Sequence, residues 1–241
     1  MIKKIIITFI ILKLFNVSNL QCNDCYSEYW QSFFWRMWDN NTFAIATYIK
    51  IDSKNHFKRI RAYQLNEQFI WQAKKNLSLE LHYAYLNGRP ILENSKWRWQ
   101  HRLELEFNPS FPLSCGPLIV TRNRLEIRYF KTESVPIYRW RQRTMLTIPL
   151  KNNSLLKSFS IYNELFYNAS DQRISQNRIC PFQLRIALSK KAELDLYFIF
   201  RFINRDNFWY KSAIIGTQFI FKYVTACKFF KTLTKIKGRL F

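Results

Sequence analysis

The stretch of residues 96–107, KWRWQHRLELEF, places two kinds of side chain on alternate positions. Odd positions carry mainly apolar groups and even positions carry polar or charged ones: Trp97, Trp99, His101, Leu103, Leu105 and Phe107 against Arg98, Gln100, Arg102, Glu104 and Glu106. Because successive side chains of a strand point to opposite faces, this period of two predicts an extended strand with two unlike faces. Aromatics and leucines on one face and a row of charges on the other are typical of the wall of a membrane β-barrel.

The same alternation returns in residues 124–129, 138–147 and 193–201. In each segment one parity is aromatic or aliphatic, and the other carries Arg, Glu or Asp. We therefore predict that the charged parity lines a filled polar lumen. The predicted network comprises Arg98, Arg102, Glu104, Glu106, Arg124, Glu126, Arg128, Arg139, Arg141, Arg143, Glu164, Arg185, Glu193, Asp195 and Arg201.

The predicted fold is all-β: a single antiparallel transmembrane β-barrel of about 10–12 strands over residues 23–223. We count about eleven strands of roughly ten residues, near the length that a tilted strand needs to cross a bilayer. Bacterial barrels usually have an even strand number, so we expect ten or twelve. Short turns are predicted at 39–41, 74–76, 151–154 and 189–191, and residues 108–120, rich in Pro, form the longest expected irregular stretch. A change of polar parity within residues 57–73 predicts either a β-bulge or a strand end that protrudes beyond the membrane, and Pro181 is awkward inside its predicted strand.

The composition narrows the class of protein. The 241-residue chain has a formal net charge of +22, and aromatic residues make up 18% of it. Such aromatic content is not typical of a disordered chain. It suits either a barrel that displays aromatics outward or a secreted basic nucleic-acid-binding β protein, in which cations and aromatics bind phosphates and bases. Because the cations are spread over nearly every strand and face an apolar parity, we favour the barrel and expect no nucleic-acid partner.

The two ends of the chain carry different signals. Lys3 and Lys4 precede an apolar run from Ile5 to Leu12, which predicts a secretory signal peptide over residues 1–22. The run is too short to span a bilayer. Residues 224–241 form a basic C-terminal extension, which we interpret as an amphipathic surface helix, a basic tail or a distorted closing strand. These features predict a bacterial outer-membrane location, with outer-membrane lipid and the barrel-assembly machinery as partners.

No catalytic, cofactor or metal site is predicted. The five cysteines match no zinc pattern, although Cys22 and Cys25 could close a small disulfide. His82 has the inward parity and could pair with Ser78, as in a barrel-type outer-membrane lipid hydrolase. No nucleophile motif surrounds it, so we favour a hydrogen-bonded structural histidine and a non-enzymatic protein. His101 has the lipid-facing parity.

Several short motifs resemble a bacterial family of outer-membrane β-barrels, domain of unknown function twenty-four-ninety. They are Trp30, Arg59-x-Arg61, Arg124-x-Glu126-x-Arg128, Arg139-Trp140-Arg141-x-Arg143, Tyr162-Asn163-Glu164-Leu165-Phe166-Tyr167-Asn168 and Arg178. The resemblance covers roughly residues 26–222. It implies a small barrel with an Arg/Glu interior and no established activity. The basic extension departs from the family pattern.

Two functions of the charged face stay open at this point. Opposite charges on neighbouring strands can form a salt-bridged plug that fills the barrel. Alternatively, the excess of Arg over acidic residues can form a narrow constriction that favours anions, with small anionic solutes as possible partners.

Overall fold

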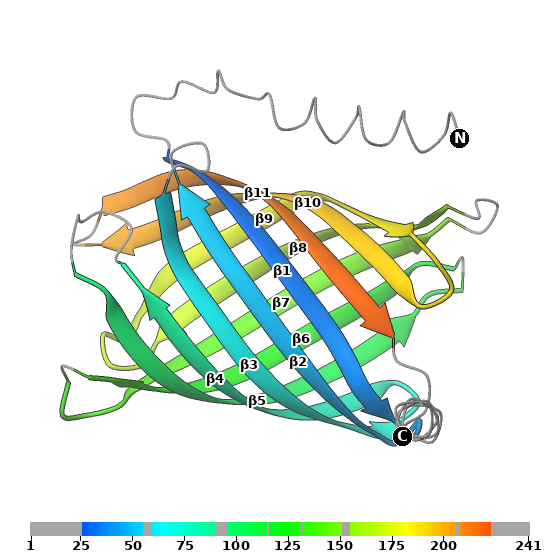
Figure 1. Cartoon of the computed structure of the whole chain (residues 1–241), viewed down its shortest axis with the longest axis horizontal. Coiled ribbons are helices and arrows are strands. Elements are labelled where there is room, and N and C mark those ends of the chain that lie inside the picture. Colours follow the sequence, from blue (N-terminus) through cyan, green and yellow to red (C-terminus); the bar gives the residue numbers. More distant parts are fainter. Residues whose placement is uncertain are drawn as a thin grey trace, which may run out of the picture.

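The computed structural model describes residues 26–54, 59–89, 96–114, 116–131, 133–150, 155–205 and 208–222. Within these ranges the chain is all-β, and it forms one closed barrel of eleven strands (Figure 1). The strands are β1 (Tyr26–Asp39), β2 (Phe43–Lys54), β3 (Arg59–Lys74), β4 (Leu77–Gly88), β5 (Arg98–Pro112), β6 (Leu118–Phe130), β7 (Ile137–Pro149), β8 (Leu156–Asn168), β9 (Arg173–Ala187), β10 (Ala192–Arg205) and β11 (Phe208–Lys222). No helix long and apolar enough to cross a membrane occurs in these ranges. The predicted signal peptide, the Cys22–Cys25 pair and the basic extension lie outside the described residues.

Each strand pairs in antiparallel fashion with the next along the chain, and the barrel closes between β1 and β11. This closing pair is parallel, with a register from Tyr26↔Ser212 to Arg36↔Lys222. The two strands run side by side in the same direction in Figure 1. The expected even strand number and wholly antiparallel sheet were therefore wrong. With an odd number of up-and-down strands, the first and the last run the same way, so closure is necessarily parallel.

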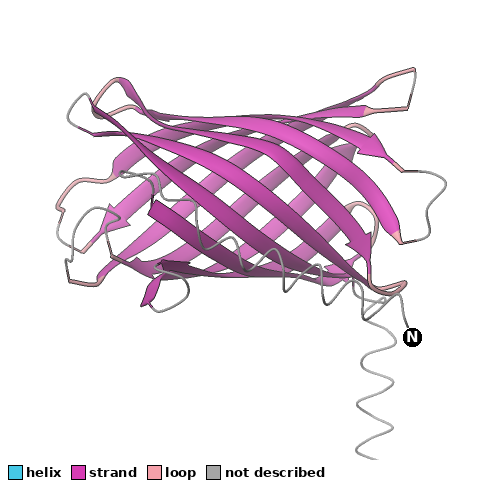
Figure 2. Ribbon diagram, turned by 90° about the horizontal axis from the view of Figure 1, so that it is seen from above, coloured by secondary structure: helices cyan, strands magenta, loops and turns pink. Residues whose placement is uncertain are grey.

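The barrel has two rims: β1 begins at the first rim, and β11 ends at the second. The strands cross the barrel obliquely between the rims (Figure 2). The irregular stretch predicted for residues 108–120 is shorter than expected, because β5 continues to Pro112 and β6 begins at Leu118. Pairing of β5 with β6 stops after Phe107↔Asn123 and resumes at Ser110↔Val120. This gap accommodates Pro109, which has no N–H to give to the ladder.

Two bulges account for changes of parity along the strands. The β2–β3 register shifts by one residue after Asp52↔Ala62, so Arg61 is the extra residue, and the predicted bulge in this segment is confirmed. The register of β9 shifts against both neighbours around Pro181. Because one residue is inserted there, Arg178 and Gln183, which have opposite parity, both face the lumen.

The outward face of the barrel is apolar along its height. Exposed side chains in the middle of the strands are largely aliphatic: Leu65, Leu81, Leu103, Leu105 and Leu125. Most exposed tyrosines and tryptophans lie toward the strand ends: Tyr63, Trp97, Tyr129, Tyr138 and Trp209 near the first rim, and Trp35 and Trp71 near the second. Tyr83, in the middle of β4, is an exception. An aliphatic band between aromatic girdles is the outer surface expected of a barrel in a bilayer.

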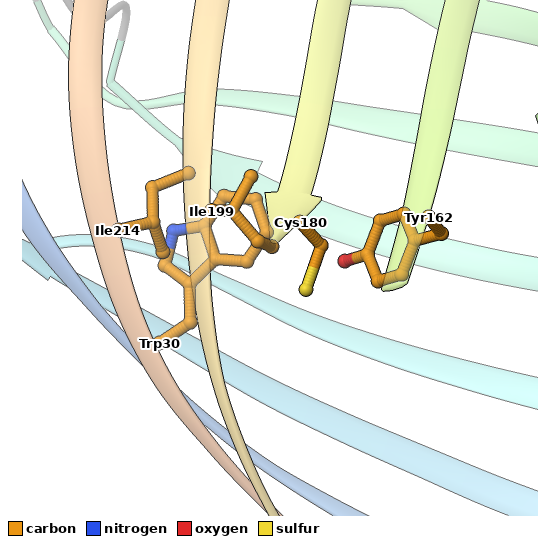
Figure 3. Packing of buried hydrophobic residues seen from close by; sticks show 5 residues of the cluster. All are labelled: Trp30, Tyr162, Cys180, Ile199 and Ile214. Carbon is orange, nitrogen blue, oxygen red and sulfur yellow. The ribbon is translucent and has the colours of Figure 1, made fainter. Parts of the chain in front are cut away.

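One wall of the lumen is apolar. Trp30, Tyr162, Cys180, Ile199 and Ile214 form a buried cluster drawn from β1 and β8–β11 (Figure 3). Tyr197 packs against this cluster, and its ring covers Gly216 on β11. A Cβ at position 216 would overlap that ring, so Tyr197 can lie over this position because residue 216 is glycine.

Candidate functional site: a cationic lumen

The lumen contains a cavity of about 590 Å³ to which all eleven strands contribute. Among the described residues that line it, cations outnumber carboxylates. The cations are Lys50, Arg61, Arg89, Arg98, Arg102, Arg122, Arg124, Arg128, Arg139, Arg141, Arg143, Arg178, Arg185 and Arg201. The carboxylates are Asp52, Glu80, Glu106 and Asp195. Four further carboxylates, Glu28, Glu104, Glu126 and Glu164, are buried and pair with arginines that line the cavity.

The main cluster lies on β4–β9 around four carboxylates, Glu104, Glu106, Glu126 and Glu164, all buried. Arg124 reaches across from β6 to β5, where it pairs with Glu104 at 2.6 Å and with Glu106. Glu126 receives Arg139 and Arg141 from β7, each at 2.6 Å. Since charged groups are very costly to bury without partners, these ion pairs are what permits charge at this depth.

Glu164 on β8 is shared by more guanidinium groups than one carboxylate can neutralise. Arg122 contacts it at 2.5 Å, Arg141 at 2.9 Å, Arg143 at 3.4 Å and Arg178 at 3.5 Å. Arg122 spans β7 to reach it, because the two residues lie on β6 and β8. A carboxylate offers about four lone-pair sites and one negative charge, so the local balance is strongly positive.

A second cluster crosses the parallel seam. Glu28 on β1 pairs with Arg201 on β10, and Arg201 also donates to Ser212 Oγ at 2.9 Å. Asp52 on β2 pairs with Lys50 at 2.8 Å and with Arg61 at 2.6 Å. The seam is thus bridged on its lumen side by an ion pair that reaches over β11.

Trp30 lies at the centre of this second cluster. Its Nε1 donates to Glu28 at 3.0 Å, and Lys50 Nζ lies 3.4 Å from the ring centroid. Arg178, from β9, approaches the same ring at 4.9 Å. Cations from opposite sides of the seam therefore approach the same indole ring, which attracts them by cation–π interaction.

A third, smaller cluster lies near the second rim. Arg185 Nε donates to Asp195 at 2.7 Å, and Gln183 donates to the same carboxylate at 2.8 Å. Glu193 pairs with Lys222 at 2.5 Å. These pairs are more exposed at their cationic ends than those of the main cluster.

The predicted network residues thus fall into separate groups. Those on β5–β8 come together in the main cluster, except Arg98, which is exposed near the first rim, and Arg128, which forms no ion pair with a described residue. Arg201 belongs to the seam cluster, and Arg185, Glu193 and Asp195 form the third. The predicted network left out several residues that lie in the lumen, namely Glu28, Trp30, Lys50, Asp52, Arg61, Arg122 and Arg178, whereas Gln100 was already assigned to the polar parity. Arg122 shares the parity of Arg124, so that signal was available.

His82 is buried and hydrogen-bonded, as the structural interpretation expected. Its Nε2 lies 2.9 Å from Glu80, and its Nδ1 lies 3.4 Å from Glu104. Ser78 Oγ donates to Glu80 at 3.1 Å rather than to His82, so no Ser–His pair forms. On the outer face of the barrel, His101 Nδ1 lies 2.5 Å from Tyr83 Oη.

Glu80, His82 and Glu106 offer three ligand atoms within 4.8 Å of one another. These groups already have partners within the protein, because Arg124 pairs with Glu106 and Asn108 donates to Glu80 at 2.8 Å. A divalent cation there would also lie among the arginines of the main cluster. The set is accounted for by its internal hydrogen bonds and ion pairs.

Comparison with known proteins gives two matches of different strength. A chain whose structure is titled "NanC porin structure in rhombohedral crystal form" shares 14% identity, with 79% of this chain and 91% of that chain covered and a TM-score of 0.47. No curated protein matches. Residues 27–212 match the family described as "Protein of unknown function (DUF2490)". The predicted resemblance is confirmed, and the chain belongs to this family.

Proposed function

We propose that the chain is an outer-membrane barrel whose lumen is a narrow pore that favours anions. The observation that carries this proposal is the imbalance of the lining, where arginines and one lysine outnumber the carboxylates with which they pair. Rings of Arg and Lys favour anions in other pores, because their positive charge compensates for the hydration free energy that a small anion gives up when it leaves bulk water. The outer surface, aliphatic in its middle and aromatic near its rims, supports a position in a bilayer.

The sharing of carboxylates strengthens the argument for anions over cations. Several buried guanidinium nitrogens have no hydrogen-bond partner among the described residues, including Nε of Arg61, Arg102, Arg128, Arg141 and Arg143. An N–H without an acceptor in a buried place is destabilising. Water or an anion in the cavity would supply the missing acceptors.

The structural plug is a second candidate, and the seam cluster favours it. Lys50, Arg178 and Arg201 all approach the Trp30 ring, within 3.4, 4.9 and 5.7 Å of its centroid. This convergence from β2, β9 and β10 reduces the free cross-section. In this account the charges serve stability, and the barrel conducts nothing.

Planar-bilayer recording separates the two functions. The full chain is extracted from the outer-membrane fraction, where heat-modifiable gel mobility marks the folded barrel, and is inserted into a bilayer under a KCl gradient. The pore predicts discrete conductance steps and a reversal potential displaced toward the chloride equilibrium potential. Absence of conductance at every voltage would eliminate the pore in favour of the plug, and a reversal potential on the potassium side would contradict the anion preference.

A further inference from the structure

Arg128 on β6 has a guanidinium that lies beside the main cluster and takes no part in its ion pairs. Within the described ranges it forms no ion pair. Its Nη2 donates to Gln100 Oε1 at 3.4 Å, its Nε has no partner, and its guanidinium lies 4.9 Å from the centroid of Phe130. Arg128 lines the cavity near the first rim, where β5 begins and β6 ends.

The position of Arg128 makes this lack of an acid unusual. Arg102 and Arg128 are direct partners across the β5–β6 ladder, and both line the lumen. Like charges placed directly opposite each other destabilise a sheet unless something between them compensates. Arg102 pairs with Glu104 at 3.3 Å and lies 3.8 Å from Glu126, whereas Arg128 has only the Gln100 amide, a neutral acceptor, among the described residues.

Two other Arg–Arg pairs in the same wall show the contrast. Arg124 and Arg141 are ladder partners on β6 and β7, and both contact Glu126, at 3.8 and 2.6 Å. Arg122 and Arg143 are also ladder partners, and both contact Glu164. Each of these pairs therefore shares a carboxylate, whereas Arg102 and Arg128 share only an amide oxygen.

Gln100 completes a set of donors without acceptors. Its side chain is 1% exposed, and its Oε1 accepts from Arg102 Nη2 at 2.9 Å as well as from Arg128. Its Nε2 has no hydrogen-bond partner among the described residues. Nε of Arg102 and Nε of Arg128 are also without hydrogen-bond partners. Buried donors of this kind call for an acceptor that the chain does not supply.

We propose that Gln100, Arg102 and Arg128 form an oxyanion-binding site in the lumen, which takes the carboxylate or phosphate group of a small solute. An oxyanion fits better than chloride, because its several oxygens can accept from two guanidiniums and an amide at once. Arg98 lies two positions before Gln100 on β5 and also lacks an ion pair with a described residue, which extends positive charge to the rim. The inference rests on the proposed pore only for the route by which the solute arrives.

Inorganic phosphate is the probe, measured by equilibrium dialysis against the full-length folded barrel in an uncharged detergent at low ionic strength. The wild-type protein is expected to bind phosphate saturably, with one site per chain, and acetate is expected to compete. Gln100→Glu is the decisive variant, because it places a carboxylate between the two guanidiniums and fills the site from within. This variant is expected to fold normally and to lose phosphate binding.

Arg128→Gln is expected to weaken phosphate binding about tenfold or more, the usual effect of removing one charge-assisted hydrogen bond. Arg36→Gln is the matched control, because it removes the same formal charge from a residue near the second rim that pairs with Asp39 at 2.8 Å. That control is expected to bind phosphate as the wild type does.

The site would be disproved by an absence of saturable binding in the wild type, or by binding that Gln100→Glu and Arg128→Gln leave unchanged. Its failure differs from failure of the pore. Selective anion conductance without phosphate binding would disprove only the binding site. Phosphate binding without conductance would disprove only the pore.

Discussion

Glu164→Gln is expected to destabilise the barrel by at least about 3 to 5 kcal/mol, the usual cost of leaving a buried charge without its partner. Arg122, Arg141, Arg143 and Arg178 would lose the carboxylate that they share. An amide keeps the shape and one acceptor oxygen but supplies no negative charge. The free energy of unfolding in urea, measured with the barrel in lipid vesicles, gives the effect.

A rim carboxylate provides the comparison for this variant. Asp39→Asn removes one carboxylate whose ion pair with Arg36 has side chains that are 38% and 30% exposed, so its effect should stay below about 1 kcal/mol. If Glu164→Gln does not fold, the double variant Glu164→Gln/Arg143→Gln should recover folding in part, because it removes one of the repelling cations. Equal stability of Glu164→Gln and wild type would contradict the shared-carboxylate account.

Arg201→Ala is expected to open the parallel seam. Arg201 is 2% exposed, and it connects Glu28 on β1 to Ser212 on β11. Its loss leaves buried Glu28 with the longer of its two ion pairs, to Arg61 at 3.5 Å, and should cost about 3 kcal/mol. Hydrogen exchange of the β1 and β11 amides should rise more than that of β5 and β6, because opening begins where the partner is lost.

A double-mutant cycle distinguishes pairing from packing at this seam. Glu28→Gln/Arg201→Met removes both charges and keeps much of the volume, and such replacements are often neutral or stabilising. The double variant should therefore be more stable than either Glu28→Gln or Arg201→Met alone. A double variant that is as unstable as the sum of the single changes would show that the ion pair is not what holds β1 to β10.

The alternation on β5 was predictable because its two faces contact different surroundings. Leu103 and Leu105 are exposed outward, whereas Glu104 and Glu106 are buried in the lumen. The number of strands could also be predicted closely, because the sequence contains about eleven segments with alternating apolar and polar residues. The parallel closure was not, because it follows from whether that number is odd, and the preference for even numbers misled us.

There are physical reasons why some lumen residues were not predicted from the sequence. Residues 26–38 carry aromatics on both faces, with Trp30 inward and Trp35 outward, so period two gives no contrast there. Arg178 and Gln183 have opposite parity, and the bulge at Pro181 turns both toward the lumen. An alternating pattern of polar and apolar residues does not show such a bulge. The pairing of Arg122 with Glu164 over β7 depends on the relative placement of three strands, which a single-strand pattern does not contain.

The account depends most on the claim that alternate side chains face lipid and lumen. Bromolipid quenching of two single-tryptophan variants tests it: one keeps native Trp30, which is 4% exposed, and the other carries only Leu105→Trp, at a position that is 48% exposed. In vesicles with bromine on the acyl chains, the tryptophan at 105 is predicted to be strongly quenched and Trp30 to retain its fluorescence. Equal quenching of the two, or stronger quenching of Trp30, would contradict the barrel in a bilayer.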